Sequence, residues 1–154
     1  MTKRAMIGDR VAGQVNACHK CLGARTFSCY SHVASGTCFA CKGVGIERHV
    51  DRSLRSQPQS EWPRAVKLSM IADCLALLAS LAQGRESGLL WPETPRAQRE
   101  IRIWLVAEIR ELSIATDVEV FDRAMVAVDK FSPRDWDKVR ELRAQSFPSA
   151  TVAA

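Results

Sequence analysis

The sequence predicts a small zinc-knuckle and β-hairpin module followed by an all-α bundle of about four helices. Two observations lead to this fold class. Two Cys-x-x-Cys pairs lie in the first third of the chain, separated by a gap that a hairpin can span. From residue 62 onward, apolar residues recur every three or four positions, which is the period of an amphipathic helix.

Changes in composition divide the chain into parts. Residues 1–50 contain the cysteine pairs and are predicted to be a basic zinc-binding module, although residues 1–16 show no strong period. Residues 51–61 are polar, contain a proline and are predicted to be a linker. Residues 62–145 carry the helical pattern and are expected to have a core of their own. Residues 146–154 are predicted to be a flexible tail.

The cysteine pairs are predicted to bind one structural zinc ion. Cys18 and Cys21 form the first pair, Cys38 and Cys41 the second, and sixteen residues separate the pairs. A two-residue gap brings two thiolates to one side of a tetrahedral ion, and the second pair closes the tetrahedron from the other side. The β-prone run at 26–30 is expected to be the outgoing strand of the intervening hairpin.

A glycine follows each pair by two residues, at Gly23 and Gly43. Positive φ at these glycines would turn backbone N–H groups toward the thiolates. Two other roles for the cysteines are less favoured. A redox couple would need a βαβ context, which the sequence does not show, and an iron–sulfur cluster also uses four thiolates, but two separated knuckles with glycines suit a single ion better. Cys29 and His32 form a third pair with a two-residue gap. They can be ligands of a second, incomplete site, one of them can replace a cysteine of the two pairs, or both can be spectators.

The motif around the second pair resembles a known family. Residues 38–45 read Cys-Phe-Ala-Cys-Lys-Gly-Val-Gly, and residues 18–25 match this pattern except that Arg25 replaces the last glycine. This Cys-x-x-Cys-x-Gly-x-Gly motif is similar to the repeat of the cysteine-rich zinc domain of DnaJ (Hsp40) chaperones. Those chaperones carry four repeats and two zinc ions, so two repeats imply one ion.

Half-size modules similar to this one occur in lambda-type Q antiterminators and in the anti-TRAP regulator. The chain has no His-Pro-Asp motif of a J-domain, so the resemblance does not extend to stimulation of Hsp70. The resemblance therefore implies a zinc module in a regulatory or adaptor protein. The helical half resembles no family.

Each of the four helices has a predicted start. The first begins at Pro63 and ends at Gly84, and the second opens with Thr94 as its cap. The third begins at a capping box over residues 116–119, with Thr116 as the cap. The fourth follows Ser132 as its cap. The residues of the fourth helix predicted to face inward are Trp136, Val139 and Leu142.

The charge distribution points to a polyanionic partner. Residues 1–60 carry nine basic and three acidic residues, a net charge of +6, whereas the rest of the chain carries thirteen basic and fourteen acidic residues. The first function hypothesis is therefore nucleic-acid binding. The predicted phosphate contacts are Lys20, Arg25, Lys42 and Arg48. The aromatic residues that can either stack on bases or cover the zinc are Phe27, Tyr30 and Phe39.

The second hypothesis is a protein-binding adaptor or inhibitor that docks on a larger machine. The apolar loop Leu89, Leu90 and Trp91 is the predicted docking surface, and it can instead pack on the protein's own bundle. By analogy alone, a small accessory protein of this kind fits a phage or mobile element. DNA, RNA and protein all remain open as the partner, and the oligomeric state is not predicted.

No enzymatic activity is expected. A zinc ion closed by four sulfurs leaves no position for water, and the chain has no phosphate-binding glycine loop, Gly-x-Ser-x-Gly or His-Glu-x-x-His motif. The N-terminus lacks the apolar region of a secretory signal, and no run of about 18 uncharged apolar residues appears. We therefore expect a cytoplasmic protein with no membrane partner and with reduced thiols.

Overall fold

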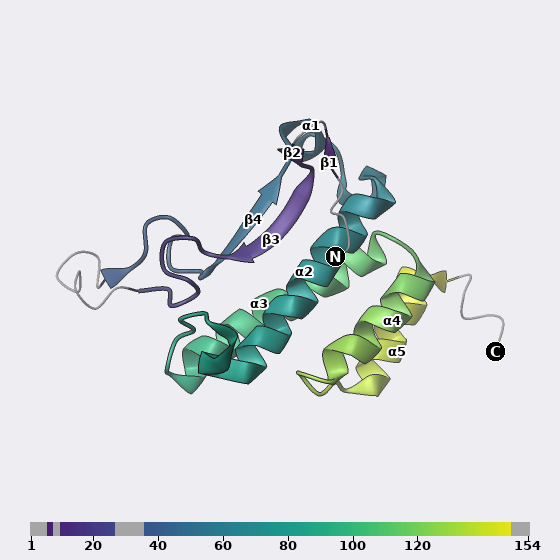
Figure 1. Cartoon of the computed structure of the whole chain (residues 1–154). Coiled ribbons are helices and arrows are strands. Elements are labelled where there is room, and N and C mark those ends of the chain that lie inside the picture. Colours follow the sequence, from purple (N-terminus) through teal and green to yellow (C-terminus); the bar gives the residue numbers. More distant parts are fainter. Residues whose placement is uncertain (1–5, 8–9, 27–35, 149–154) are drawn as a thin grey trace.

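The computed structural model describes residues 6–7, 10–26 and 36–148 (Figure 1). It confirms the predicted fold class, because short antiparallel strand pairs are followed by a set of helices. The elements in chain order are β1 (Met6–Ile7), β2 (Arg10–Val11), β3 (Gly13–Ala17), β4 (Ile46–Val50), α1 (Arg52–Arg55), η3 (Gln59–Glu61), α2 (Arg64–Gln83), η4 (Gly84–Ser87), α3 (Pro95–Ile114), α4 (Val118–Asp129) and α5 (Trp136–Ser146).

The β3–β4 hairpin carries the cysteine segments. Its strands pair antiparallel from Gly13 opposite Val50 to Ala17 opposite Ile46, so residues 18–45 leave and return at the same end. No element was expected for residues 1–16, and β3 corrects this. Of the strand expected at 26–30, Thr26 forms a bridge with Thr37, and residues 27–30 lie outside the described residues.

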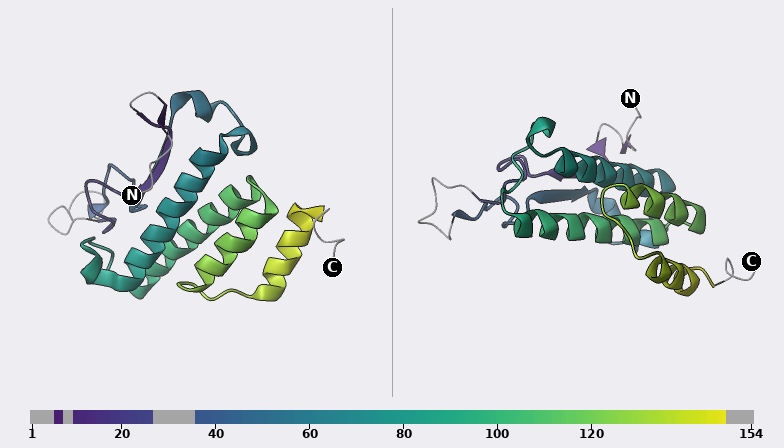
Figure 2. Two further views of the ribbon diagram at one scale, coloured as in Figure 1. Left: turned by 45° about the vertical axis from the view of Figure 1, so that its right-hand side comes forward. Right: turned by 90° about the horizontal axis from the view of Figure 1, so that it is seen from below.

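The hairpin packs against the helices. Figures 1 and 2 show β3 and β4 on one side of α2 and α3, and α4 and α5 on the other side. Ala12 before β3, Val15 of β3 and Ile46 of β4 are buried in the same apolar core as the helices. The Asp73 carboxylate of α2 accepts a hydrogen bond from the backbone N–H of Val15 at 3.0 Å. The expectation that the helical half has a core of its own is therefore wrong.

The segment predicted to be a linker, 51–61, contains α1 and η3. Leu54 of α1 is buried, and its carbonyl accepts a hydrogen bond from Trp62 Nε1 at 2.8 Å. The buried Lys67 of α2 donates to the Ser60 carbonyl and to the Ala115 carbonyl after α3. These contacts attach the segment to the bundle. The domain boundaries themselves stay a prediction.

Helix α2 is the central helix. Its length and composition, with mean hydropathy 1.8, are those of a membrane span, although 44% of its apolar window is buried inside the protein. The same properties suit the core helix of a bundle, so this is weak evidence for a membrane. Met70, Cys74 and Leu78 of α2 are buried in the shared core.

One of the four predicted helix starts, that of α3, is confirmed to the residue. The start predicted for α2 is one residue early, because Pro63 is its cap and the helix begins at Arg64; Gly84, with φ 65°, ends it as predicted. Helix α3 is capped by Thr94, whose side chain accepts the N–H of Ala97. The start predicted for α4 is one residue early, because Asp117 caps it while the hydroxyl of Thr116 donates to the Leu112 carbonyl of α3.

The start of α5 also needs correction. Asp135, rather than Ser132, is the cap, since its carboxylate accepts the backbone N–H groups of Asp137 and Lys138. Trp136, the first residue of α5, is 37% exposed and does not face inward as predicted. Further along α5, Val139 and Leu142 pack against the core as expected.

Candidate metal centre

The four cysteine sulfurs form one compact cluster. The Sγ atoms of Cys18 and Cys38 are 3.8 Å apart, those of Cys21 and Cys41 are 3.7 Å apart, and all four lie within 4.8 Å of one another. A tetrahedral ion with bonds of about 2.3 Å has sulfur–sulfur edges of about 3.8 Å. All four side chains are buried. The cluster therefore fits one tetrahedral metal ion, and Cys29 and His32 lie outside the described residues.

In each knuckle a backbone N–H donates a hydrogen bond to a cysteine sulfur. The N–H of Arg25 lies 3.3 Å from the Cys21 sulfur, and the N–H of Gly45 lies 3.2 Å from the Cys41 sulfur. Gly45 has φ 85° and Arg25, at the equivalent position of the first knuckle, has φ 72°. Arg25 thus adopts the backbone conformation of the motif's glycine, which is strained for a residue with a side chain.

Contacts of its side chain hold Arg25 in this conformation. Arg25 Nε donates to the Gly43 carbonyl at 2.6 Å, and Nη1 pairs with the Glu100 carboxylate of α3 at 2.8 Å. The backbone of Arg25 also takes part, because its carbonyl accepts a hydrogen bond from the N–H of Cys38 at 2.9 Å. Arg25 therefore joins both knuckles to α3, which explains how the first repeat works without its last glycine.

Burial opposes the ionisation of two of the four thiols, those of the first knuckle, in the absence of a metal. Burial raises the pKa of Cys18 to about 12 and also raises the pKa of Cys21. Burial acts in the same direction at Cys38, but the backbone N–H groups of Cys41 and Ala40 outweigh it and lower the pKa of that thiol. A metal ion binds thiolates, so its binding here releases protons.

Two imidazoles and a carboxylate lie beside the cluster. His19 Nδ1 is 2.6 Å from Glu47 Oε1, and His49 Nε2 is 3.1 Å from Glu47 Oε2. Desolvation raises the pKa of the Glu47 carboxyl, but hydrogen bonds to His49 and His19 outweigh it, so that the pKa lies below its ordinary value. Cys18, His19 and Glu47 form a second possible ligand set, which shares Cys18 with the four-cysteine cluster.

The first knuckle is attached to the loop before α3. The N–H of Leu90 donates to the Leu22 carbonyl at 2.8 Å, and Trp91 lies against Gly23. Trp91 is buried and its Nε1 donates to the Ser80 hydroxyl at 3.2 Å. Of the predicted docking loop, Trp91 and the partly buried Leu89 thus pack on the protein itself, while Leu90 is 60% exposed.

Gly23 is one of the points where the metal module contacts the bundle, so Gly23→Ala is expected to destabilise the protein. A Cβ there would lie 2.6 Å from the Trp91 ring, and φ is 93°, where a side chain adds strain. We expect a loss of about 2–4 kcal/mol in the free energy of unfolding, measured in urea. Gly43→Ala is the matched control, because it has φ 79° and a milder contact of 3.1 Å with Thr37. Equal losses in the two variants would contradict tight docking on Trp91.

The four predicted phosphate contacts fall into two classes. Lys20 and Lys42 are exposed on the two knuckles. Arg25 pairs with Glu100, whereas Arg48 lies 2.9 Å from the Glu108 carboxylate of α3 and 5.3 Å from the centre of the Trp62 ring. Among the residues that the structure describes, the two lysines are therefore the members of the predicted set without an acidic partner.

Of the three aromatic residues of the module, one lies in the described part of the chain. Phe39, inside the second knuckle, is 71% exposed and so does not cover the sulfur cluster. Phe27 and Tyr30 lie outside the described residues.

Comparison with protein-family models, with curated proteins and with solved structures finds no match for this chain. The likeness to the DnaJ-type zinc domain therefore depends on two sequence segments, the complete motif at residues 38–45 and the motif at residues 18–25 that lacks its last glycine. The geometry supports metal binding, and it does not by itself point to a family.

Proposed function

We propose that the ion of the cysteine cluster is a single zinc and that its role is structural. Four thiolates at tetrahedral spacing are the donor set typical of structural zinc sites. Because protein sulfur fills all four positions and the cysteines are buried, no position is left for a reactive water. We therefore also propose that the protein is not an enzyme.

The function that the site supports best is nucleic-acid binding by the zinc module of a cytoplasmic regulatory or accessory protein. The observation that carries this proposal is the exposed aromatic ring of Phe39 on a module that also exposes Lys20 and Lys42. Single-stranded nucleic acids are bound by aromatic rings that stack on bases and by cations that contact phosphates. One metal cluster holds both knuckles, so the three side chains are carried by one small module.

A second candidate function is docking on a protein partner. Leu22 and Val44 are 40% and 39% exposed on the knuckles, and Leu90 beside them is 60% exposed. Together with Phe39 these side chains offer an apolar surface of the kind that protein interfaces bury. The two candidates differ in their dependence on salt, because phosphate contacts weaken steeply as salt rises and apolar contacts do not.

Charge reversal at the knuckles tests the proposal. We expect Lys20→Glu with Lys42→Glu to weaken binding of single- and double-stranded oligonucleotides and to flatten the salt dependence by about one unit per lost phosphate contact. Zinc content and thermal stability should change little, since surface substitutions cost under about 0.5 kcal/mol. Phe39→Ala should weaken binding of single strands by about 1–3 kcal/mol per stacked base. Fluorescence anisotropy at two salt concentrations measures these effects.

Leu90→Ala is the control variant, because it removes an exposed apolar side chain without changing charge. Its affinity for oligonucleotides should equal that of the unmodified protein. If the unmodified protein binds no oligonucleotide at low salt, nucleic-acid binding is wrong and protein docking takes its place. A Leu90→Ala protein that loses a protein partner from a lysate treated with nuclease would support that second function.

A further inference from the structure

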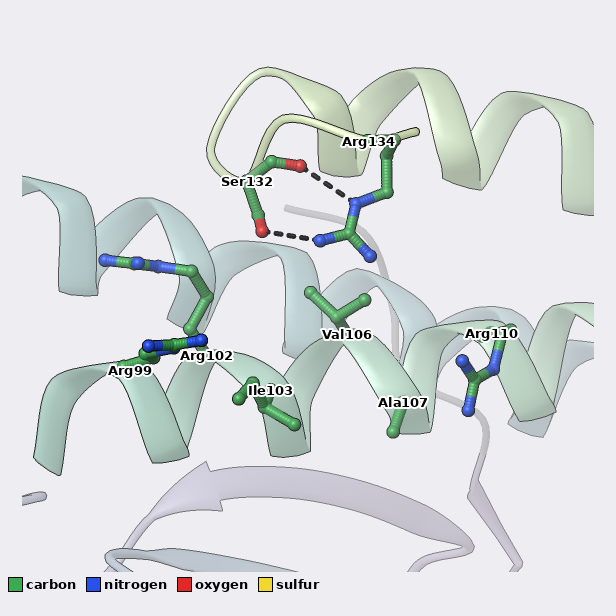
Figure 3. Close-up of a pocket in the computed structure, with 8 residues that line it drawn as sticks. All are labelled: Arg99, Arg102, Ile103, Val106, Ala107, Arg110, Ser132 and Arg134. Carbon is green, nitrogen blue, oxygen red and sulfur yellow. Dashed lines mark hydrogen bonds between the residues drawn. The ribbon is translucent and has the colours of Figure 1, made fainter. Parts of the chain in front are cut away.

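One face of α3 concentrates arginines over an apolar floor. Its residues recur at spacings of three and four, and this face lies away from Ile101, Leu105 and Ile109, which point into the core. With the loop between α4 and α5 it encloses a pocket of about 340 Å³ (Figure 3). The residues that line the pocket are Arg99, Arg102, Ile103, Val106, Ala107, Arg110, Ser132 and Arg134.

The pocket is lined by four guanidinium groups and by no carboxylate. Elsewhere on the helices arginines pair with acids, as in Arg123 with Glu119 and Arg143 with Asp122. Within the described part of the chain, the three α3 arginines of the pocket have no such partner. Like charges repel one another at this density, so the arrangement favours a bound anion.

The fourth arginine is oriented by the loop before α5. Arg134 donates from Nε to the Ser132 carbonyl at 3.0 Å and from Nη2 to the Ser132 hydroxyl at 2.8 Å. Figure 3 shows its guanidinium extending from this loop toward Val106 of α3. Ser132 is itself buried. The loop therefore holds this positive charge over the pocket instead of leaving it free in solvent.

The charges on α3 are sorted by side of the helix. Glu100 and Glu108 turn toward the zinc module, where they pair with Arg25 and Arg48. The arginines of the pocket occupy a different side. Glu100 and Glu108 are thus neutralised within the protein, whereas the arginines of the pocket remain available to a ligand.

The length of the face indicates an extended ligand. Arg99 and Arg110 are eleven residues apart, which is about 16 Å along a helix. Successive phosphates of one nucleic-acid strand, about 3.4 Å apart along the duplex axis, match arginines spread along this length of helix better than a single phosphate does. Ile103, which is 59% exposed, and Val106 provide an apolar floor for sugars or bases between the phosphates.

We propose that this face, named the arginine face for Arg99, Arg102, Arg110 and Arg134, binds the phosphodiester backbone of a nucleic acid. The inference rests on the proposed nucleic-acid function and adds a second contact surface, on the helical half, to the knuckles. Arginine suits this role because its planar group forms paired hydrogen bonds with phosphate oxygens.

The test replaces two arginines of the face and compares them with two that are already paired. Arg99→Gln with Arg110→Gln should weaken binding of short oligonucleotides at least about tenfold and lower the salt slope by about 0.7–0.9 per lost contact. The control, Arg123→Gln with Arg140→Gln, removes the same charge from exposed residues that pair within their own helices. Its affinity should stay within about twofold of the unmodified protein. Zinc content and helical circular dichroism should be unchanged in both.

The outcomes separate the inference from the proposed function. If the unmodified protein binds no oligonucleotide at low salt, the proposed function and the inference both fail. If it binds, but the Arg99 and Arg110 double variant binds as tightly as the control double variant, the inference alone is wrong. Loss of binding only after charge reversal of Lys20 and Lys42 would then place all phosphate contacts on the knuckles.

Discussion

Replacement of Cys21 or Cys41 by serine is expected to remove the metal and to unfold much of the chain. A structural zinc ion contributes about 10–16 kcal/mol at neutral pH, which is comparable to the whole stability of a typical domain. Elemental analysis should show one zinc in the unmodified protein and none in the variants. Circular dichroism should show a large drop in the melting temperature, with loss of helical signal as well as loss of the module.

The effect on the helices is the informative part of this prediction. Val15 and Ile46, from the strands that flank the metal site, are buried in the core of the bundle, and Trp91 packs on the first knuckle. Unfolding of the module therefore exposes apolar surface of α2 and α3. Cys74→Ala is the control, because Cys74 is buried in α2 and does not belong to the cluster. The Cys74→Ala protein should therefore keep its zinc. A reduced, folded protein that contains no metal would contradict the prediction.

The sequence allowed the metal cluster and most helices to be predicted for local reasons. Two-residue gaps between cysteines fix the knuckles, and the proline after Thr94 and the glycine after α2 mark helix ends. Strand β3 was missed because Gly13–Ala17 is short and mixes small with polar residues, so its burial depends on α2 rather than on its own pattern. The burial of Leu54 was also missed, because a polar segment surrounds this residue in the sequence.

The charged residues of the helical half show a second limit of prediction from the sequence. The net charge of residues 61–154 is close to zero. This sum hides a helix in which Glu100 and Glu108 pair with the zinc module while Arg99, Arg102 and Arg110 lie on a different side. The spacing of Arg99, Arg102 and Arg110 was a usable signal, because it places them on one side of a helix. The sequence carried no such signal for the pairing of Arg25 and Arg48 with α3, because that pairing depends on how the hairpin packs against the helix.

The pair Arg48 and Glu108 joins the zinc module to α3, and its removal from one side is expected to be costly. The Glu108 side chain is 10% exposed and the Arg48 side chain 32% exposed. Arg48→Met keeps the apolar stem near Trp62 but leaves a buried carboxylate without its cation. We expect the free energy of unfolding to fall by about 3 kcal/mol at neutral pH. Urea unfolding of the zinc-loaded protein measures this loss.

The pH dependence of that loss identifies its cause. Burial raises the pKa of Glu108 above its ordinary value of 4.5, and Arg48 lowers it, so the pKa should rise further in the Arg48→Met variant. A carboxyl with a raised pKa in the folded state stabilises that state when protonated, and this stabilisation is lost as the pH rises from 4.5 through the folded pKa. The difference between the variant and the unmodified protein should therefore be larger at pH 8 than at pH 5. Because both proteins bind the same ion, the effect of pH on the thiolates cancels in this difference. Arg48→Met combined with Glu108→Gln should recover most of the loss and remove its pH dependence, whereas a loss that is equal at both pH values would show that packing, not the buried charge, is responsible.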